Sequence, residues 1–393
     1  MLRILGERPR YPHTKLTQSQ EIDYNTRVVM DIPFLKKLSL PEGGLFTHKP
    51  ANIVGIDIGT FSTKVVQLKY EKERGILETY GELLNESYFA ENPGSSLIHR
   101  SDTEIVTVVQ EILKEANVTT KEAVFSIPAG SSFITTIQFP HMLESELKEA
   151  IPFETRRYIP IPVSEVVLDW EVLGPTEDRE KLDILLIAVP RETVEKFKRV
   201  SEQSGLRMRS LEVETFSLVR SLGAGDLTPT MYINLGHLTS AIAMADKGRL
   251  RVSHSFARGS SELTKILSRS LGVTKERAES VKREVGMSEK MEEKEIASVI
   301  SPFIEVLFLE VERFLSIYNR KAPRTIQKIN LTGGGSNLKG IVEYAVSKFG
   351  IEVTRGNPFS QVVAPAFMQP TLREIGPGFS VAVGLALHEL TSQ

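Results

Sequence analysis

The segment Gly55-Ile-Asp-Ile-Gly-Thr-Phe-Ser-Thr-Lys64 joins two predicted β-strands through a glycine turn. The apolar run that begins at Asn52 predicts a buried strand ending at this turn. Residues 63–70 alternate between apolar and polar side chains, which is typical of a second strand, and residues 76–84 predict a third. A meander of three strands followed by a predicted helix over residues 102–116 indicates a domain of the α/β class.

The turn carries groups that suit a polyphosphate ligand. Backbone N–H groups at Gly59 and the hydroxyls of Thr60, Ser62 and Thr63 can donate hydrogen bonds to phosphate oxygens. Asp57 stands at the strand end, where a carboxylate can hold Mg²⁺ through water, and Lys64 can supply positive charge. An ordinary hairpin turn explains the same residue types, so this segment alone leaves both interpretations open.

Two further glycine turns follow predicted strands in the second half of the chain. Asn234-Leu-Gly-His-Leu-Thr239 ends one strand, and the strands after it repeat the order seen at residues 53–84. In Thr332-Gly-Gly-Gly-Ser336, the absence of side chains lets the backbone approach a flat ligand, and the N–H groups that open the next helix favour an anion. The repeat predicts two similar lobes whose turns face each other across one cleft.

The composition is that of a globular protein. Of 393 residues, 41% are hydrophobic and 25% are charged, and the net charge of −2 gives no electrostatic reason to expect a nucleic acid partner. The lack of cysteine excludes disulfides and thiol catalysis. Walker A, dinucleotide-binding and nucleophile-elbow motifs are absent, as is a zinc-type histidine spacing. Because the apolar runs are too short to span a bilayer and no secretory signal precedes them, we expect a cytoplasmic protein.

Residues 1–50 differ from the rest of the chain. They contain five of the 20 prolines, and eight basic against five acidic residues give them a charge of +3, which leaves −5 for the remainder. We predict an N-terminal extension rather than a domain. Within it, Asp31-Ile-Pro-Phe-Leu-Lys-Lys-Leu-Ser-Leu40 predicts one or two amphipathic turns that dock on a partner or on lipid headgroups; a tail with scattered apolar residues is the alternative.

The order of the three turns resembles the actin, Hsp70 and sugar kinase superfamily of nucleotide-binding proteins over residues 51–390. Within that superfamily, Ala150-Ile-Pro-Phe-Glu-Thr-Arg-Arg-Tyr-Ile-Pro-Ile-Pro162 and Val167-Leu-Asp-Trp-Glu-Val-Leu173 resemble the PilM family of type IV pilus assembly proteins. Both stretches lie in an insertion similar to subdomain 1C, which the division protein FtsA shares. FtsA usually ends in a basic amphipathic membrane helix, and the absence of such a helix here favours the PilM family over an FtsA-like division protein.

The resemblance implies an α/β fold of two actin-like (ribonuclease H-like) lobes around a nucleotide cleft, with a β-α-β-β-α subdomain inserted in the first lobe. Two details are predicted within this scheme: Asp102 caps the helix over residues 102–116, and Pro302 starts a new helix. The expected subdomains are 1A at 51–130 and 206–228, 1C at 131–205, 2A at 229–259 and 326–393, and the helical 2B at 260–325.

The resemblance also implies ATP and Mg²⁺ as cofactors and assigns the site residues, with Asp57 holding Mg²⁺ through water. Superfamily members often carry a Glu and a Lys beside the base, which match Glu279 and Lys282; a solvated helix face explains this pair equally well. The expected nucleotide-binding residues are Gly59, Thr60, Phe61, Ser62, Lys64, Gly236, His237, Glu279, Lys282, Gly333, Gly334, Gly335 and Ser336.

One position departs from the superfamily pattern. The second turn usually begins with an Asp that helps to organise Mg²⁺ and the attacking water, and this chain has Asn234 instead. An amide can orient water, but it accepts no proton and binds a hard cation more weakly than a carboxylate does. We therefore expect ATP binding with weak or absent hydrolysis, Asn234 being a poor catalytic substitute. The alternative is a small-molecule kinase of the same fold, which would need a carboxylate base near the acceptor hydroxyl.

The PilM resemblance implies a partner: the cytoplasmic N-terminal tail of a PilN-like bitopic inner-membrane protein. The chain would then be cytoplasmic, peripheral to the inner membrane through its partner, and able to couple its nucleotide state to the inner-membrane platform. The pilus motor ATPase and the platform protein are further expected partners. The sequence leaves open whether the chain forms a homodimer and whether it serves a pilus or the related type II secretion machinery.

Overall fold

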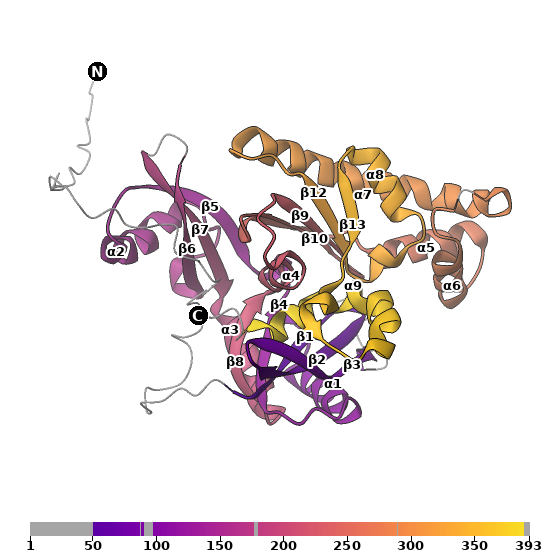
Figure 1. The fold of residues 1–393 in the computed structure, drawn as a ribbon, viewed down its shortest axis with the longest axis horizontal. Coiled ribbons are helices and arrows are strands. Elements are labelled where there is room, and N and C mark those ends of the chain that lie inside the picture. Colours follow the sequence, from indigo (N-terminus) through magenta and orange to yellow (C-terminus); the bar gives the residue numbers. More distant parts are fainter. Residues whose placement is uncertain (1–49, 87, 90–96, 177–179, 289, 389–393) are drawn as a thin grey trace, which may run out of the picture.

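The computed structural model describes residues 50–86, 88, 89, 97–176, 180–288 and 290–388. The amphipathic turns predicted at residues 31–40 lie outside the described residues. The described chain forms two large β-sheets and a small one, and Figure 1 shows the small sheet to the left of the two large ones. Within these residues, no helix is long and apolar enough to cross a membrane.

The first lobe is built on a six-stranded sheet in the order β14-β3-β2-β1-β4-β8. Strands β1, β2 and β3 are antiparallel, as the alternating pattern predicts, whereas β4 and β8 run parallel to β1. The strands are β1 (Asn52–Ile58), β2 (Ser62–Glu71), β3 (Arg74–Leu84), β4 (Glu122–Ile127), β8 (Arg207–Val213) and β14 (Val362–Val363). The lobe's helices are α1 (Asp102–Glu115), α3 (Arg191–Gln203), α4 (Glu214–Gly223) and α9 (Gln369–Ala386).

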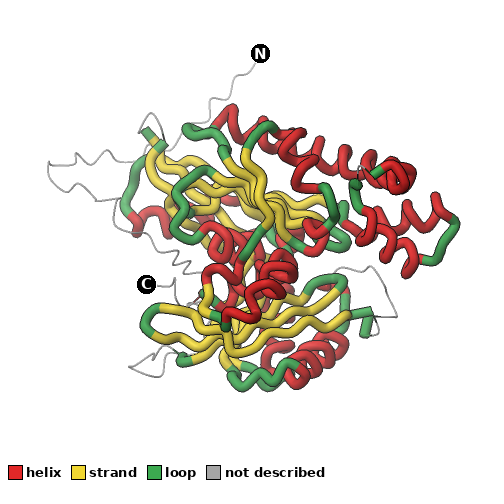
Figure 2. Tube along the Cα trace, turned by 45° about the vertical axis from the view of Figure 1, so that its right-hand side comes forward, coloured by secondary structure: helices red, strands yellow, loops and turns green. Residues whose placement is uncertain are grey.

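Helices cover both faces of this sheet because the buried residues of β1 point alternately to opposite sides. Val54 and Ile56 join the core that includes α1 and α3, whereas Ile53 packs with α4 and α9. A Cβ at Gly55 would lie only 2.3 Å from the Ala382 carbonyl oxygen, so glycine is what lets α9 approach β1 this closely. Figure 2 shows helices on both sides of the first-lobe sheet, with one group between this sheet and the rest of the molecule.

The second lobe repeats the connectivity of the first on a five-stranded sheet in the order β11-β10-β9-β12-β13. Its first three strands are antiparallel and β12 runs parallel to β9, as β4 does to β1. The strands are β9 (Thr230–Leu235), β10 (Ser240–Asp246), β11 (Arg249–Phe256), β12 (Lys328–Thr332) and β13 (Glu352–Arg355). The helices are α5 (Ser260–Leu271), α6 (Lys275–Val285), α7 (Lys294–Lys321) and α8 (Ile341–Phe349). The repeat confirms the predicted two-lobed actin-like fold.

The insertion is a three-stranded antiparallel sheet in the order β5-β7-β6 with helix α2 beside it. Along β7, Ile184 and Leu186 join a core with α2, and the alternating Leu185 and Ile187 join the core of the first lobe. The insertion therefore packs on the first lobe through one face of its sheet. Its elements are β5 (Phe133–Pro140), α2 (Glu144–Glu154), β6 (Val166–Pro175) and β7 (Lys181–Pro190). Helix α3 follows β7 and completes the predicted β-α-β-β-α order along the chain, but its apolar side chains pack in the core of the first lobe.

Three local predictions differ from the structure. Ser101, not Asp102, caps α1: its hydroxyl accepts a hydrogen bond from the Glu104 N–H at 3.2 Å, and Asp102 pairs instead with Arg199 at 2.7 Å. Helix α7 runs through Pro302 without a new start, because Phe303, Ile304 and their apolar neighbours keep one buried face on the second-lobe core.

The third difference concerns the end of the chain. Residues 326–393 are predicted to lie together in the second lobe, whereas residues 358–388 return to the first sheet. There β14 pairs with β3, and Phe359, Leu372 and Phe379 pack against apolar residues of β2. The physical reason is the uncovered apolar face of β1 and β2, which α9 buries.

Candidate functional site

A cavity of about 540 Å³ lies between the two lobes. It stands at the carboxyl ends of β1, β9 and β12, and the three predicted glycine turns line it together. Apart from Ser336, every residue predicted to bind nucleotide or Mg²⁺ lines this cavity, as does Asn234. Segments that are about 180 and 100 residues apart in sequence thus meet in one place, in a crevice at the carboxyl ends of strands, where α/β folds commonly bind ligands.

The first turn is held by its own backbone. The Gly59 N–H donates to the Ser62 carbonyl oxygen at 3.0 Å, and a Cβ at Gly59 would lie 2.8 Å from that oxygen. Lys64 Nζ donates to Ser62 Oγ at 2.6 Å and pairs with Glu82 at 3.3 Å. The positive charge predicted at Lys64 is therefore present on the cavity wall. Glu82 partly balances it, and no pattern in the sequence predicted this pairing.

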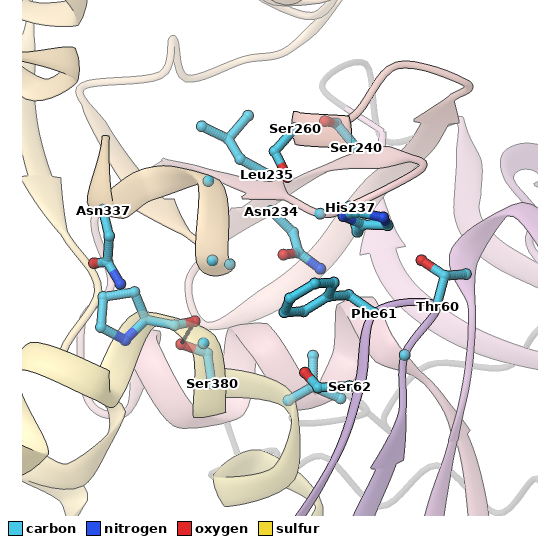
Figure 3. A pocket seen from close by; sticks show the side chains of 18 of the residues that line it. Thr60, Phe61, Ser62, Asn234, Leu235, His237, Ser240, Ser260, Asn337 and Ser380 are labelled. Carbon is cyan, nitrogen blue, oxygen red and sulfur yellow. Dashed lines mark hydrogen bonds between the residues drawn. The ribbon is translucent and has the colours of Figure 1, made fainter. Parts of the chain in front are cut away.

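The second turn faces the first across the cavity. The rings of His237 and Phe61 lie 4.9 Å apart between centroids, and Figure 3 shows both beside Asn234. Burial lowers the pKa of His237 to about 4, and the nearby Lys282 ammonium adds to this effect. His237 is therefore neutral near pH 7, and the contact between the rings links the two lobes at the cavity.

Two carboxyl groups stand at the floor of the cavity. Asp57 Oδ1 accepts a hydrogen bond from Ser126 Oγ at 2.8 Å, and burial raises the pKa of Asp57. Glu214 accepts from the Ala129 N–H at 2.8 Å and from Asn234 Nδ2 at 3.1 Å. Burial raises the pKa of Glu214 to about 7 despite the Ala129 hydrogen bond, and the Asp57 charge contributes to the rise.

Sequence reasoning did not assign a role to Glu214 or Ser126. Glu214 opens α4 directly after β8, so an acidic residue at a strand end was the signal that could have found it. Ser126 stands one residue before the end of β4 and carries no motif of its own. Because β1, β4 and β8 are parallel neighbours, only the strand order brings these groups to Asp57.

The third turn needs glycine. Gly333 has φ 78°, and a Cβ there would lie 2.3 Å from Asn234 Oδ1; a Cβ at Gly335 would lie 2.8 Å from Leu235 Cβ. Larger residues would thus push the second and third turns apart. Ser336 is buried and donates to the Gly333 carbonyl oxygen at 2.7 Å, so it shapes the turn instead of lining the cavity.

Glu279 and Lys282 form an ion pair on the cavity wall rather than a solvated helix face. Lys282 Nζ donates to Glu279 Oε2 at 2.5 Å and to Thr264 Oγ1 at 2.9 Å. Although burial opposes it, this pairing lowers the pKa of Glu279 to about 2. Beyond the pair the lining becomes apolar, which the sequence analysis did not predict, through Leu263, Phe303, Ile304, Leu307 and Ile341.

The cavity suits a nucleotide with its phosphates at the first two turns. Backbone, hydroxyl and ammonium groups gather at one end, and bare glycine backbone beside an apolar wall suits a flat base at the other. The described residues contain no group of three or more His, Asp or Glu side chains placed to hold a metal ion.

Known proteins share this architecture. A chain of the solved PilM-PilN type IV pilus biogenesis complex superposes with a TM-score of 0.74 at 24% identity, covering 87% of this chain and 98% of that one. MreB5 of Spiroplasma citri bound to AMPPNP gives a TM-score of 0.50 at 12% identity, covering 88% and 97%. These likenesses support the fold alone.

Sequence comparisons are more specific. The cell division protein FtsA of Enterococcus hirae is 23% identical over 353 residues, which cover 78% of this chain and 78% of that protein. Residues 55–390 match the family model of the type IV pilus assembly protein PilM. Since this match covers nearly all of the described residues, the chain belongs to the PilM family.

Proposed function

We propose that this protein is an ATP-binding cytoplasmic scaffold of type IV pilus assembly, whose nucleotide state is coupled to the inner-membrane platform. Membership of the PilM family supports the pilus role. The observation that carries the nucleotide part is the convergence of three glycine turns on one cavity between two lobes. A ligand that touches both lobes favours their closed arrangement, because it gains contacts only when they are close.

The residues divide into three roles in this proposal. The turns that contain Gly59 and Gly236 hold the phosphates, with Lys64 nearby; the turn at residues 333–335 and the apolar wall hold the base. Bound Mg²⁺ would neutralise phosphate charge, and Asp57 would orient its water ligands. The structural neighbour MreB5 is bound to AMPPNP, which supports a nucleotide in the cleft by analogy of fold.

We propose that binding, rather than rapid turnover, is the main use of ATP. Asn234 cannot accept a proton from water, and its amide already donates to Glu214 at 3.1 Å. Glu214, with a pKa of about 7, is the group at the floor best suited to accept a proton. Both of its oxygens already accept hydrogen bonds, however: Oε1 from the Ala129 N–H and Oε2 from the Asn234 amide. Slow hydrolysis through Glu214 is compatible with a scaffold.

The proposed partner is the cytoplasmic N-terminal tail of a PilN-like inner-membrane protein. The solved PilM-PilN complex, which has the same fold, supports this choice. A peptide tail binds in extended form through backbone pairing and a few side-chain pockets, and β6 offers a strand edge in the insertion. Such a contact would make the protein peripheral to the inner membrane. The motor ATPase, the platform protein and a second copy of the chain stay predictions.

One experiment separates the nucleotide and partner parts. Isothermal calorimetry measures Mg-ATP and Mg-ADP binding, and fluorescence anisotropy measures a labelled PilN tail peptide with each nucleotide and with none. We expect ATP binding, and peptide affinity that differs between nucleotide states. A scrambled peptide is the control. Absence of ATP binding would refute the nucleotide site, and equal affinity for tail and scrambled peptides would refute the partner.

A further inference from the structure

The insertion contacts the second lobe as well as the first, through a contact that we call the seam. Strand β11, at one edge of the second-lobe sheet, lies along β5, at one edge of the insertion's sheet. Thr136 Oγ1 on β5 donates to the Arg251 carbonyl oxygen on β11 at 2.7 Å. This hydrogen bond joins two sheets that are not otherwise paired as strands.

Arg249 on β11 makes several polar contacts across the seam. Its Nε donates to Glu171 Oε1 on β6 at 2.7 Å. The same guanidinium donates to the carbonyl oxygens of Val172 and Leu173, the latter at 3.3 Å. The side chains of Arg249 and Glu171 are only 16% and 10% exposed. One second-lobe side chain thus binds a carboxylate and two backbone groups of the insertion, which fixes the position of β6.

Two buried polar atoms at the seam lack hydrogen-bond partners among the described residues. Glu171 Oε2, on the insertion, and Arg251 Nε, on the second lobe, are buried and have no hydrogen-bond partner. Buried polar atoms without partners cost free energy, which water would restore if the seam opened. The Arg249–Glu171 ion pair favours the closed seam, whereas the two unpartnered atoms favour an open, hydrated seam. Because these contributions oppose each other, a ligand can shift the equilibrium between the two states.

A second contact ties the insertion to the cavity. The turn that leads into it, η3 (Ala129–Ser131), donates its Ala129 N–H to Glu214 at the cavity floor at 2.8 Å. The same turn lies against β11, since a Cβ at Gly130 would be 3.2 Å from Ser255 Oγ. The insertion is therefore held at the floor of the cleft by the first lobe and along β11 by the second.

We propose that the seam transmits closure of the cleft to the insertion, with the Arg249–Glu171 pair as the contact that forms when the lobes close. This inference rests on the proposed nucleotide function and adds the route by which the bound nucleotide reaches the insertion. When the lobes separate, β11 moves away from β6 and the pair breaks. When a nucleotide draws the lobes together, the pair orders β5 and β6.

Hydrogen exchange of the full chain tests this route, with and without Mg-AMPPNP. In the wild type we expect the nucleotide to slow exchange by about threefold or more in the turn at 55–64 and also in β5 and β6. Arg249→Met keeps the aliphatic stem but loses the pair. It should retain slowing at 55–64 and lose it in β5 and β6. Glu171→Gln, a milder change, should reduce the slowing in β5 and β6.

Arg324→Met is the matched control. It removes an ion pair of the same length, 2.7 Å to Asp246 on β10 of the second-lobe sheet. The Arg324 guanidinium donates to Asp246 and to the Leu227 carbonyl oxygen, and neither residue belongs to the insertion. This variant should behave as the wild type does. Slowing in β5 and β6 that persists in Arg249→Met, or that is absent in a wild type whose turn at 55–64 is protected, would overturn the inference. No protection at 55–64 in the wild type would instead refute the nucleotide site on which it rests.

Discussion

Replacing Glu214 with glutamine should change how the stability of the nucleotide-free protein depends on pH. Burial raises the pKa of this carboxyl from 4.5 to about 7. When folding raises the pKa of a carboxyl group, the folded state binds the proton more tightly than the unfolded state does. The resulting stabilisation is complete below the unfolded pKa, here 4.5, and is lost as the pH rises through the folded pKa of about 7. Glutamine has nearly the same shape and does not ionise, so the variant should lack this loss.

The expected size follows from the shift. A rise from 4.5 to about 7, at about 1.36 kcal/mol per pH unit, amounts to roughly 3.4 kcal/mol when complete. The linkage relation gives a loss of about 2.5 kcal/mol between about pH 5 and about pH 8. These are upper values, because Glu214 lines the cavity and keeps some contact with water. The unfolding entropy is about 2.1 cal/mol/K per residue, so a chain of this length shifts its Tm by roughly 1.2–1.4 °C per kcal/mol, and the Tm advantage of the variant should grow by roughly 3–4 °C over this range.

Thermal unfolding followed by circular dichroism, at constant ionic strength and without nucleotide, measures this difference. Glu82→Gln is the matched control, since Glu82 also lines the cavity but has a lowered pKa despite its burial, owing mainly to Lys64. Its stability contribution is lost at acidic pH, so its Tm difference should not grow between about pH 5 and about pH 8. Parallel Tm curves for the wild type and Glu214→Gln would refute the raised pKa and the description of Glu214 as a proton acceptor.

Four further predictions concern the site and the core. Asp57→Ala should weaken Mg-ATP binding at least about tenfold by calorimetry; unchanged affinity would exclude Asp57 from the metal position. Asn234→Asp should raise the ATP turnover measured by phosphate release about tenfold or more, because a carboxylate can accept a proton; equal rates would show that this position does not limit hydrolysis. Deleting residues 1–48 should leave Tm and ATP affinity unchanged, and loss of cooperative melting would show that the segment belongs to the core. Arg220→Met should cost about 3–5 kcal/mol in urea unfolding, since it leaves Glu212 buried without its bidentate partner at 2.8 and 2.9 Å; a loss below about 1 kcal/mol would contradict this.

Local patterns were enough to predict the two lobes and the three turns. The alternation over residues 63–70 fits β2, although packing buries side chains on both of its faces, and glycine at position 333 fits a backbone with φ 78°. These features depend on neighbours in sequence, so they can be read from it. The prediction that Pro302 starts a new helix was wrong for a related reason. Proline is a local signal for a helix start, but the core that keeps α7 continuous through Pro302 comes from distant segments.

Contacts between distant segments could not be predicted in this way. Glu214 and Ser126 reach Asp57 because β4 and β8 follow β1 in the sheet, and no spacing along the chain encodes that order. The charges of Lys64 and Lys282 were predicted, whereas their pairing with Glu82 and Glu279 and the resulting pKa of about 2 at Glu279 depend on packing.

The sequence by itself determined the class of fold, the PilM resemblance, and a chain in which glycine turns end three strands, because hydrophobic period and turn chemistry are local properties. Only the tertiary structure decided that α9 returns to the first lobe, that Glu214 stands beside Asp57, and that Arg249 binds the insertion. Each of these depends on which apolar faces remain uncovered after the local elements form, and on which polar groups are then buried together.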